Sequence, residues 1–207
     1  MIKNIFFILC HQDDEMGIFN KIKDSLIQKK NVFILFMTSG YNKNISKNKT
    51  TKRDMESINV LQKIGVKKEN IFFIGRKHNI RIYELYLNLH IAYNNLLSII
   101  KKIKGDIIIF THSWEGGNED HDACHSIVKK LFQKNKKIKK CYQFSLYHGK
   151  NLPLNFFKVQ DLFKQNGEII KDKISFADKI KFLRYLFYYK TQIKVWFGLY
   201  PFIILNI

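Results

Sequence analysis

Five short apolar runs recur along the chain, and the segments between them have apolar residues at helical spacing. The runs are residues 5–9, 32–37, 71–74, 107–110 and 142–146. Continuous apolar runs that alternate with helices are typical of a parallel sheet buried on both faces. The sequence therefore predicts an α/β fold: one Rossmann-like domain over residues 1–207, with a mostly parallel sheet and helices on both faces.

Helices are predicted in most of the intervening segments. The first begins near Gly17, and others cover residues 51–64, residues 82–103 and the segment after His121. Residues 42–50, rich in Lys and Asn, are predicted to form a mobile loop.

A polar loop, Cys-His-Gln-Asp-Asp-Glu, follows the first apolar run at residues 10–15. In open α/β sheets, sites form at the carboxyl ends of strands. The adjacent carboxylates of Asp13 and Asp14 repel each other, and a divalent cation would relieve this repulsion. His11 and one Asp can ligate a metal, which leaves the other Asp free for proton transfer. The alternative is a polar loop in which Asp13 or Asp14 caps the next helix.

A second polar loop follows the fourth apolar run. Gly116 and Gly117 permit a tight turn there, and His121 lies in the first turn of the next helix, where the helix dipole disfavours a protonated imidazole. Because strand-end loops of a parallel sheet can meet in one crevice, we expect His11, Asp14 and His121 to form a two-His, one-carboxylate site. Such a set leaves positions open, as catalytic metal sites do.

Several motifs resemble those of the PIG-L/LmbE-like family of metal-dependent N-acetyl sugar deacetylases. Residues 11–15, His-Gln-Asp-Asp-Glu, resemble the family's His-Pro-Asp-Asp-Glu, and residues 114–121, Trp-Glu-Gly-Gly-Asn-Glu-Asp-His, resemble its Tyr-Glu-Gly-Gly-His-Pro-Asp-His. Thr-Ser-Gly at residues 38–40 resembles the end of the family's second strand. Arg53, three positions before Glu56, resembles its Arg-x-x-Glu helix.

The resemblance implies roles for these residues. It implies that His11, Asp14 and His121 ligate the metal, which is usually zinc, with Fe²⁺ or another divalent metal as alternatives. It implies that Asp13 is the general base and that Asp120 orients a neighbouring His.

Substrate contacts are expected from Arg53, Trp114, Gly116 and Gly117. One departure concerns Asn118, where the family often has a His that helps to stabilise the oxyanion or to protonate the leaving amine. Asn118 can donate a hydrogen bond but cannot shuttle a proton.

Three other histidines lie near the predicted site. His125 is four residues after His121 on the same helical face. Such a His-x-x-x-His pair can ligate a metal, but the site already has three ligands, so a packed role or a contact to one of those ligands is favoured. His112 and His148 lie near strand ends, where either could line the pocket. An ordinary hydrogen-bonded role is favoured for both.

The charge of the chain is strongly positive, at +19 from 36 Lys and Arg against 17 Asp and Glu. Only four of the 36 are Arg, the residue that bidentate phosphate and base readout favours, so no nucleic-acid partner is expected. Three cysteines without a Cys-x-x-Cys pair suit a reducing compartment. A cytoplasmic location is predicted.

The C-terminal region, residues 176–207, differs from the rest. Residues 176–190 are predicted to form a basic amphipathic helix, and residues 195–207 carry no charge. These 13 residues are too few to span a bilayer, which needs roughly 20. The region either docks on the domain or contacts the cytoplasmic face of a membrane peripherally.

The resemblance implies hydrolysis of the N-acetyl amide of an N-acetylglucosamine-type sugar or glycoconjugate, with release of acetate and an amino sugar. One alternative is a catalytically impaired family member that binds glycans or a membrane surface. Another is a non-haem Fe(II) oxygenase, which uses the same ligand set, although usually on a mainly β scaffold.

Overall fold

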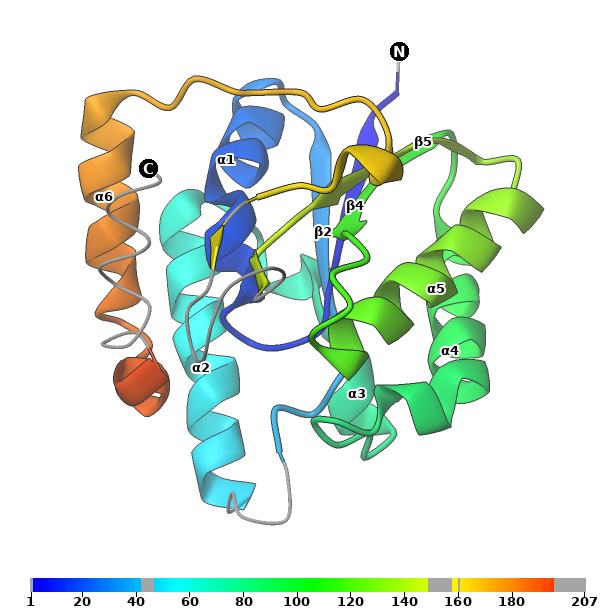
Figure 1. Ribbon diagram of the computed structural model, residues 1–207, viewed down its shortest axis with the longest axis horizontal. Helices are drawn as coiled ribbons and strands as arrows, with labels where there is room; N and C mark the ends of the chain where they lie inside the picture. Colours follow the sequence, from blue (N-terminus) through cyan, green and yellow to red (C-terminus); the bar gives the residue numbers. More distant parts are fainter. Residues whose placement is uncertain (1, 42–46, 149–157, 160, 196–207) are drawn as a thin grey trace.

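A five-stranded sheet forms the centre of the molecule in the computed structural model, which describes residues 2–41, 47–148, 158–159 and 161–195. All five strands are parallel, in the order β3-β2-β1-β4-β5, which confirms the predicted fold class (Figure 1). The strands are β1 (Asn4–Leu9), β2 (Asn31–Phe36), β3 (Ile71–Phe73), β4 (Ile107–His112) and β5 (Ile138–Phe144). Two short antiparallel strands follow, β6 (Tyr147–His148) and β7 (Lys158–Val159).

Helices cover both faces of the sheet. The α-helices are α1 (Phe19–Ile27), α2 (Lys47–Ile64), α3 (Ile74–Lys77), α4 (Leu89–Lys102), α5 (Glu119–Lys134) and α6 (Phe176–Leu186). Short 3₁₀ turns are η1 (Asp14–Ile18), η2 (Lys68–Asn70), η3 (Leu85–Asn88), η4 (Lys164–Asn166) and η5 (Lys190–Gln192). Helices α4 and α5 pack on one face, α1 and α2 pack on the other, and α6 lies outside α1 and α2 (Figure 1).

The side chains of β1 alternate between two apolar clusters. Phe6 and Ile8 join the cluster under α4 and α5, whereas Phe7 and Leu9 join the one under α1 and α2. Every residue of β1 is buried. A strand that is covered on both faces needs apolar residues at consecutive positions, which explains the unbroken run in the sequence.

Helix α6 forms a third layer on the domain. Its Phe182 and Tyr185 pack with Tyr189 against Phe19 of α1 and Val60 of α2. The uncharged stretch from residue 195 continues through residues 196–207, which lie outside the described part of the chain. Within the described ranges, none of the helices combines the length and the apolar character that crossing a bilayer requires.

Three predicted helices differ from the structure at their ends. The helix predicted over residues 82–103 begins at Leu89, because Tyr83 takes a positive φ of 66° and its backbone N–H donates to Asp120 instead of joining a helix. The helix predicted over residues 51–64 begins earlier, at Lys47, and the rest of the predicted mobile loop, residues 42–46, lies outside the described residues. The basic helix predicted over residues 176–190 ends at Leu186, because the next three backbone N–H groups bond to carbonyls three positions back.

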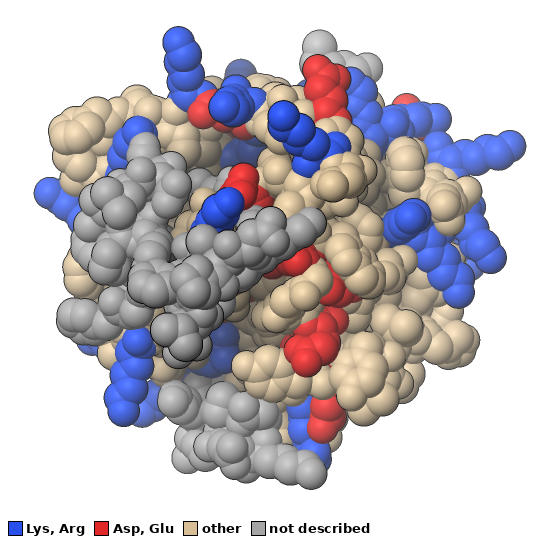
Figure 2. Space-filling model, viewed as in Figure 1, with Lys and Arg blue, Asp and Glu red and all other residues tan. Residues whose placement is uncertain are grey.

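The register of the sheet brings two loops together. Ile8 of β1 pairs with Thr111 of β4, so the loops that follow these strands start side by side. They contain the two polar motifs of the sequence. On the face shown in Figure 2, basic side chains project at the upper, left and right edges, and several acidic side chains lie nearer the middle.

Candidate active site

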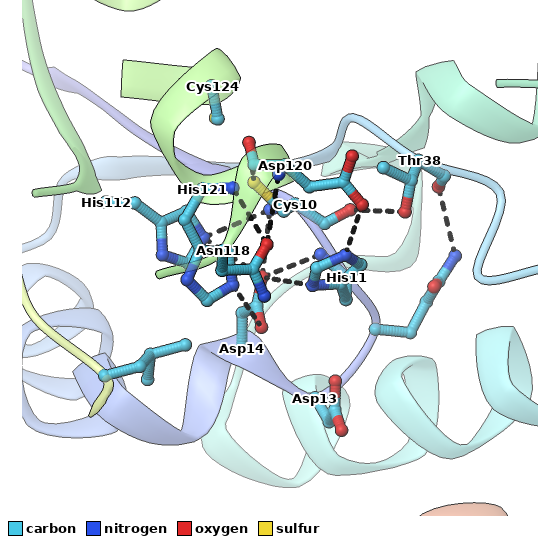
Figure 3. Close-up of polar contacts among 12 residues, drawn as sticks. Cys10, His11, Asp13, Asp14, Thr38, His112, Asn118, Asp120, His121 and Cys124 are labelled. Atoms are coloured by element: carbon cyan, nitrogen blue, oxygen red, sulfur yellow. Dashed lines mark hydrogen bonds and ion pairs between the residues drawn. The ribbon is translucent and has the colours of Figure 1, made fainter. Parts of the chain in front are cut away.

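Asp14 is the hub of a buried polar cluster at the carboxyl ends of β1 and β4 (Figure 3). Its Oδ2 atom accepts hydrogen bonds from the backbone N–H groups of Cys10, at 3.0 Å, and His11, at 2.7 Å. The same oxygen lies 3.0 Å from Nε2 of His112. Burial raises the pKa of this carboxyl, but His11 and His112 lower it by more, so the pKa of Asp14 lies well below its usual range. Asp14 is therefore an anion that faces several ring nitrogens.

His11 is held between two carboxylates. Its Nε2 atom lies 2.9 Å from Oδ2 of Asp120, and its Nδ1 atom faces Oδ2 of Asp14 at 3.5 Å. Asp120 is itself fixed by hydrogen bonds from the backbone N–H groups of Tyr83, at 2.7 Å, and Leu85, at 3.1 Å. Burial lowers the pKa of His11, but the two carboxylates outweigh it and raise the pKa to about 9. Metal-ligating histidines usually have such a carboxylate on the second ring nitrogen.

His121 has the same arrangement in the other loop. Its Nδ1 atom lies 2.9 Å from Oε2 of Glu115, whose Oε1 accepts hydrogen bonds from Ser145 Oγ and the Leu146 N–H. The Nε2 atom of His121 lies 3.7 Å from Oδ1 of Asp14 and has no hydrogen-bond partner among the described residues. This ring nitrogen is therefore available to a ligand.

The protonation of His121 differs from the sequence prediction. Burial lowers its pKa, but Asp14 and Glu115 raise it by more, to about 10. The prediction of a neutral ring weighed only the dipole of α5, and two carboxylates within 4 Å of the ring outweigh it. A divalent cation placed between these groups would take over the role of the proton.

His112 belongs to the cluster, although the sequence favoured an ordinary role for it. It ends β4, is completely buried and stacks on His121, with ring centroids 4.1 Å apart. Its Nε2 atom accepts the backbone N–H of Cys10 at 3.2 Å. Burial and the neighbouring His121 lower its pKa. His112 could have been predicted as part of the cluster only if β4 were known to pair with β1. The order of the strands along the chain does not specify that pairing.

The donor set fits a divalent cation. Four ligand atoms, from Cys10, Asp14, His112 and His121, lie within 4.8 Å of one another in the described part of the chain. Imidazole and carboxylate ligands suit zinc and other divalent metals, and a cation would satisfy the orphaned Nε2 of His121. His11 also turns its Nδ1 toward Asp14.

These five candidates are not equivalent as ligands. His11 and His121 each have a carboxylate on the second ring nitrogen, whereas Nδ1 of His112 has no partner among the described residues. Burial raises the pKa of the Cys10 thiol well above its usual value, and its Sγ atom donates to a backbone carbonyl at 3.0 Å. Of the three residues predicted to ligate the metal, Asp14 and His121 belong to the group of four donor residues, whereas His11 contacts Asp14 from outside that group.

Asp13 stands apart from the cluster (Figure 3). Its Oδ1 atom lies 3.2 Å from Nη2 of Arg53, which also donates to the carbonyl of Gln12 at 2.9 Å. Arg53 itself is buried. Burial raises the pKa of Asp13 most, Arg53 lowers it, and the result is about 6. A carboxylate with that pKa is mainly ionised at neutral pH and can accept a proton.

A cavity of about 190 Å³ opens beside these groups. Its described lining combines polar and apolar side chains, from His11, Asp13, Asp14, Met16, Gly17, Arg53, Ile82, Tyr83, Asn118, Leu146, Tyr147, Val159, Gln192 and Val195. Asp13, His11 and Asp14 thus share one opening, and Asp14 connects it to the donor cluster behind.

Asn118 lies at the N-terminus of α5 and lines the cavity. Its Oδ1 atom accepts the backbone N–H groups of Asp120, at 3.0 Å, and His121, at 3.3 Å, so it caps the helix. Its side chain also hydrogen-bonds to Tyr147. The cap fixes the orientation of the Asn118 amide at the edge of the cavity.

Three residues predicted to contact substrate lie elsewhere in the described structure. Trp114 is 48% exposed and packs its ring against His125, with centroids 6.1 Å apart. Gly116 has a φ of 67° and donates its N–H to Asp122, which gives it a role in the turn. Gly117, like these two, is not part of the described cavity lining.

One of the other histidines has a place outside the donor cluster. His125 hydrogen-bonds to the backbone carbonyl of His112 at 3.3 Å and so packs behind the cluster. The side chain of His148 lies outside the described part of the structure.

A family model described as PIG-L, GlcNAc-PI de-N-acetylase, matches residues 6–132. The match covers more than half of the chain and includes both loops of the site. The comparison with curated proteins gave no match.

Solved structures of deacetylases have the same fold. The N,N'-diacetylchitobiose deacetylase from Pyrococcus horikoshii, complexed with its inhibitor MPG, is 18% identical, with a TM-score of 0.66 over 97% of this chain and 75% of that one. The zinc-inhibited form of teicoplanin deacetylase is 13% identical, with a TM-score of 0.63 over 92% and 85% of the two chains. A conserved protein from Thermus thermophilus is 13% identical, with a TM-score of 0.56 over 97% and 84%.

Proposed function

The chain belongs to the PIG-L family, and from this premise we propose that it is a metal-dependent N-deacetylase. Its reaction is the hydrolysis of the N-acetyl amide of an N-acetylglucosamine-type sugar or glycoconjugate, and its products are acetate and an amino sugar. One observation carries the proposal: the base candidate Asp13 lines the same cavity as His11 and Asp14, and Asp14 belongs to the metal-type donor cluster.

His11, Asp14 and His121 would hold the metal, with zinc as the first candidate and Fe²⁺ as an alternative. Asp120 and Glu115 support this assignment, because each fixes the ring of one histidine ligand at 2.9 Å. When bound, a divalent cation polarises the amide carbonyl and acidifies water.

The residues of the chain then divide the proton transfers and the charge stabilisation. Asp13 accepts a proton from water as the water oxygen adds to the acetyl carbon. The side-chain amide of Asn118 donates a hydrogen bond to the developing oxyanion. The C–N bond breaks, and Asp13 passes its proton to the nitrogen of the leaving amine. Arg53 orients Asp13 throughout and adds positive charge beside the substrate.

Metal content and acetate release test this proposal together. We expect about one zinc or iron per purified chain, lost in His11→Ala and Asp14→Ala and retained in His125→Ala, whose ring lies behind the cluster. Proteins that contain the metal should release acetate from N-acetylglucosamine or GlcNAc-phosphatidylinositol, and variants that lose the metal should not. A wild-type protein that takes up no added metal would contradict the proposal.

The alternative function is a catalytically impaired binding protein, and Asn118 in place of the family's usual His is the feature that favours it. This alternative predicts that the metal-loaded protein binds an N-acetyl sugar without releasing acetate. The deacetylase proposal predicts turnover under the same conditions, so one assay separates the two functions.

The outer face of α6 supports a peripheral membrane contact at the cytoplasmic side. Phe176, Ile180 and Phe187 fall on one helical stripe and are 77%, 37% and 59% exposed, with Lys181 and Arg184 beside them. We expect the protein to co-sediment with phosphatidylserine vesicles and not with neutral phosphatidylcholine vesicles. Replacing Phe176 and Phe187 with Ser should abolish that binding, and unchanged binding would exclude this face.

A further inference from the structure

The family match ends at residue 132, and the chain beyond it returns to the site through Tyr189. This tyrosine follows α6 and is only 1% exposed. Its hydroxyl donates a 2.7 Å hydrogen bond to Oε1 of Glu15, which is fully buried. A contact between residues 174 positions apart thus joins the C-terminal segment to the loop after β1.

Glu15 in turn holds the backbone of Asp13. Its other oxygen, Oε2, accepts the Asp13 N–H at 2.9 Å. Asp13 has a φ of 125°, a conformation that non-glycine residues rarely adopt. Such backbone strain persists only where the surroundings over-determine it. Glu15 restrains the backbone of Asp13, and Arg53 restrains its carboxylate.

The same C-terminal segment also anchors α2, which carries Arg53. The backbone N–H and the hydroxyl of Thr191 donate to the carboxylate of Glu56, at 3.0 and 2.6 Å. Glu56 lies three residues after Arg53, and therefore on the same side of α2. Tyr189 thus contacts Glu15 directly, and Thr191 contacts the helical neighbour of Arg53.

We propose that Tyr189 is a positioning residue, which acts through Glu15 to keep Asp13 in the strained conformation that directs its carboxylate to the cavity. The inference rests on the proposed function, in which Asp13 is the base. Tyr189 lies outside the matched residues 6–132, so this support is not specified by the family motifs.

The first test is Tyr189→Phe, which removes the hydroxyl and keeps the ring in its apolar cluster. With N-acetylglucosamine as substrate, we expect kcat to fall at least about tenfold, while KM changes less than about twofold and metal content stays unchanged. Tyr188→Phe is the matched control, since Tyr188 is 42% exposed and lies one position away. Its kinetic constants should equal those of the wild type.

A second test needs no activity. Backbone amides of residues 10–16 should exchange hydrogen at least about tenfold faster in Tyr189→Phe than in Tyr188→Phe. A double-mutant cycle with Glu15→Gln then tests the route. If Tyr189 acts through Glu15, the kcat of the double variant should equal that of the less active single variant. Independent roles would instead multiply the two losses in kcat.

A normal kcat in folded, metal-loaded Tyr189→Phe would overturn the inference, and so would losses that multiply in the double variant. The proposed function fails separately, if the metal-loaded wild type releases no acetate from N-acetylglucosamine or GlcNAc-phosphatidylinositol. In that case the exchange rates decide: faster exchange in Tyr189→Phe supports the positioning role, and unchanged exchange overturns it.

Discussion

The two loops that build the site are stabilised in different ways. The turn within the loop after β4 is held by its own residues, because the Asp122 carboxylate accepts the backbone N–H groups of Glu115, at 2.8 Å, and Gly116, at 3.1 Å. Asn118 caps the helix that follows. These partners lie within seven positions of each other, so the turn and the helix start can form together.

The loop after β1 depends on distant parts of the chain. Arg53 reaches Asp13 from α2, Asp120 fixes His11 from α5, and Tyr189 holds Glu15 from beyond α6. The strained φ of Asp13 needs these partners, whereas His121 sits in an ordinary helical turn. The difference indicates that remote substitutions should disturb the base more than they disturb His121.

The largest effect is expected for Asp13→Asn, which alters the chemistry of the β1 loop and not its metal ligands. A neutral amide cannot accept the proton of water, so kcat should fall by about 10²–10⁴-fold. Metal content should stay at the wild-type level. Acetate release, normalised to bound metal, measures the loss, and His125→Ala serves as the control. Full activity in metal-loaded Asp13→Asn would remove the base from the mechanism.

A smaller effect is expected at Glu115 and Asp120, the carboxylates that hold His121 and His11. Glu115→Gln and Asp120→Asn should each weaken metal binding by about 10–100-fold, measured by competition with a chelator. Both substitutions should also lower the free energy of unfolding, because each carboxylate accepts two further hydrogen bonds. Asp120 accepts the N–H groups of Tyr83 and Leu85, and Glu115 accepts Ser145 Oγ and the Leu146 N–H. Unchanged metal affinity in either variant would contradict the supporting role of that carboxylate.

Much of the site could be predicted because its residues follow strands that the sequence reveals locally. The apolar run at 5–9 and the run at 107–110 correspond to β1 and β4 within a few residues. His11 and Asp14 come directly after β1, and His121 follows the Gly-Gly turn after β4. Apolar periodicity and turn residues are local signals, so these positions can be found without the fold.

The missed features depend on contacts between distant residues. The N–H groups of Tyr83 and Leu85 bind Asp120 about 36 positions away, and this shortens the helix predicted over 82–103. His112 enters the cluster because β4 lies beside β1, and Tyr189 reaches Glu15 across 174 positions. Hydrogen-bond partners of this kind are set by the packed fold, and no local pattern encodes them.

The smallest effect is expected for Arg53, whose charge and hydrogen bonds should change the pH dependence of kcat/KM differently. Asp13 must be ionised to accept a proton, so activity should fall as the pH drops through its pKa, which is about 6. Burial raises that pKa and Arg53 lowers it, so Arg53→Gln should raise it and move the acidic limb of kcat/KM to higher pH by roughly one unit.

Arg53→Lys is the matched variant for this shift. It keeps the positive charge beside Asp13 but loses the donors that bind the carbonyls of Gln12 and Gly40. Its acidic limb should therefore stay near that of the wild type, while kcat falls because Asp13 is held less firmly. If both variants shift the acidic limb equally, the pKa of Asp13 is set by the hydrogen bonds of Arg53 and not by its positive charge. If neither variant shifts it, the acidic limb does not report the ionisation of Asp13.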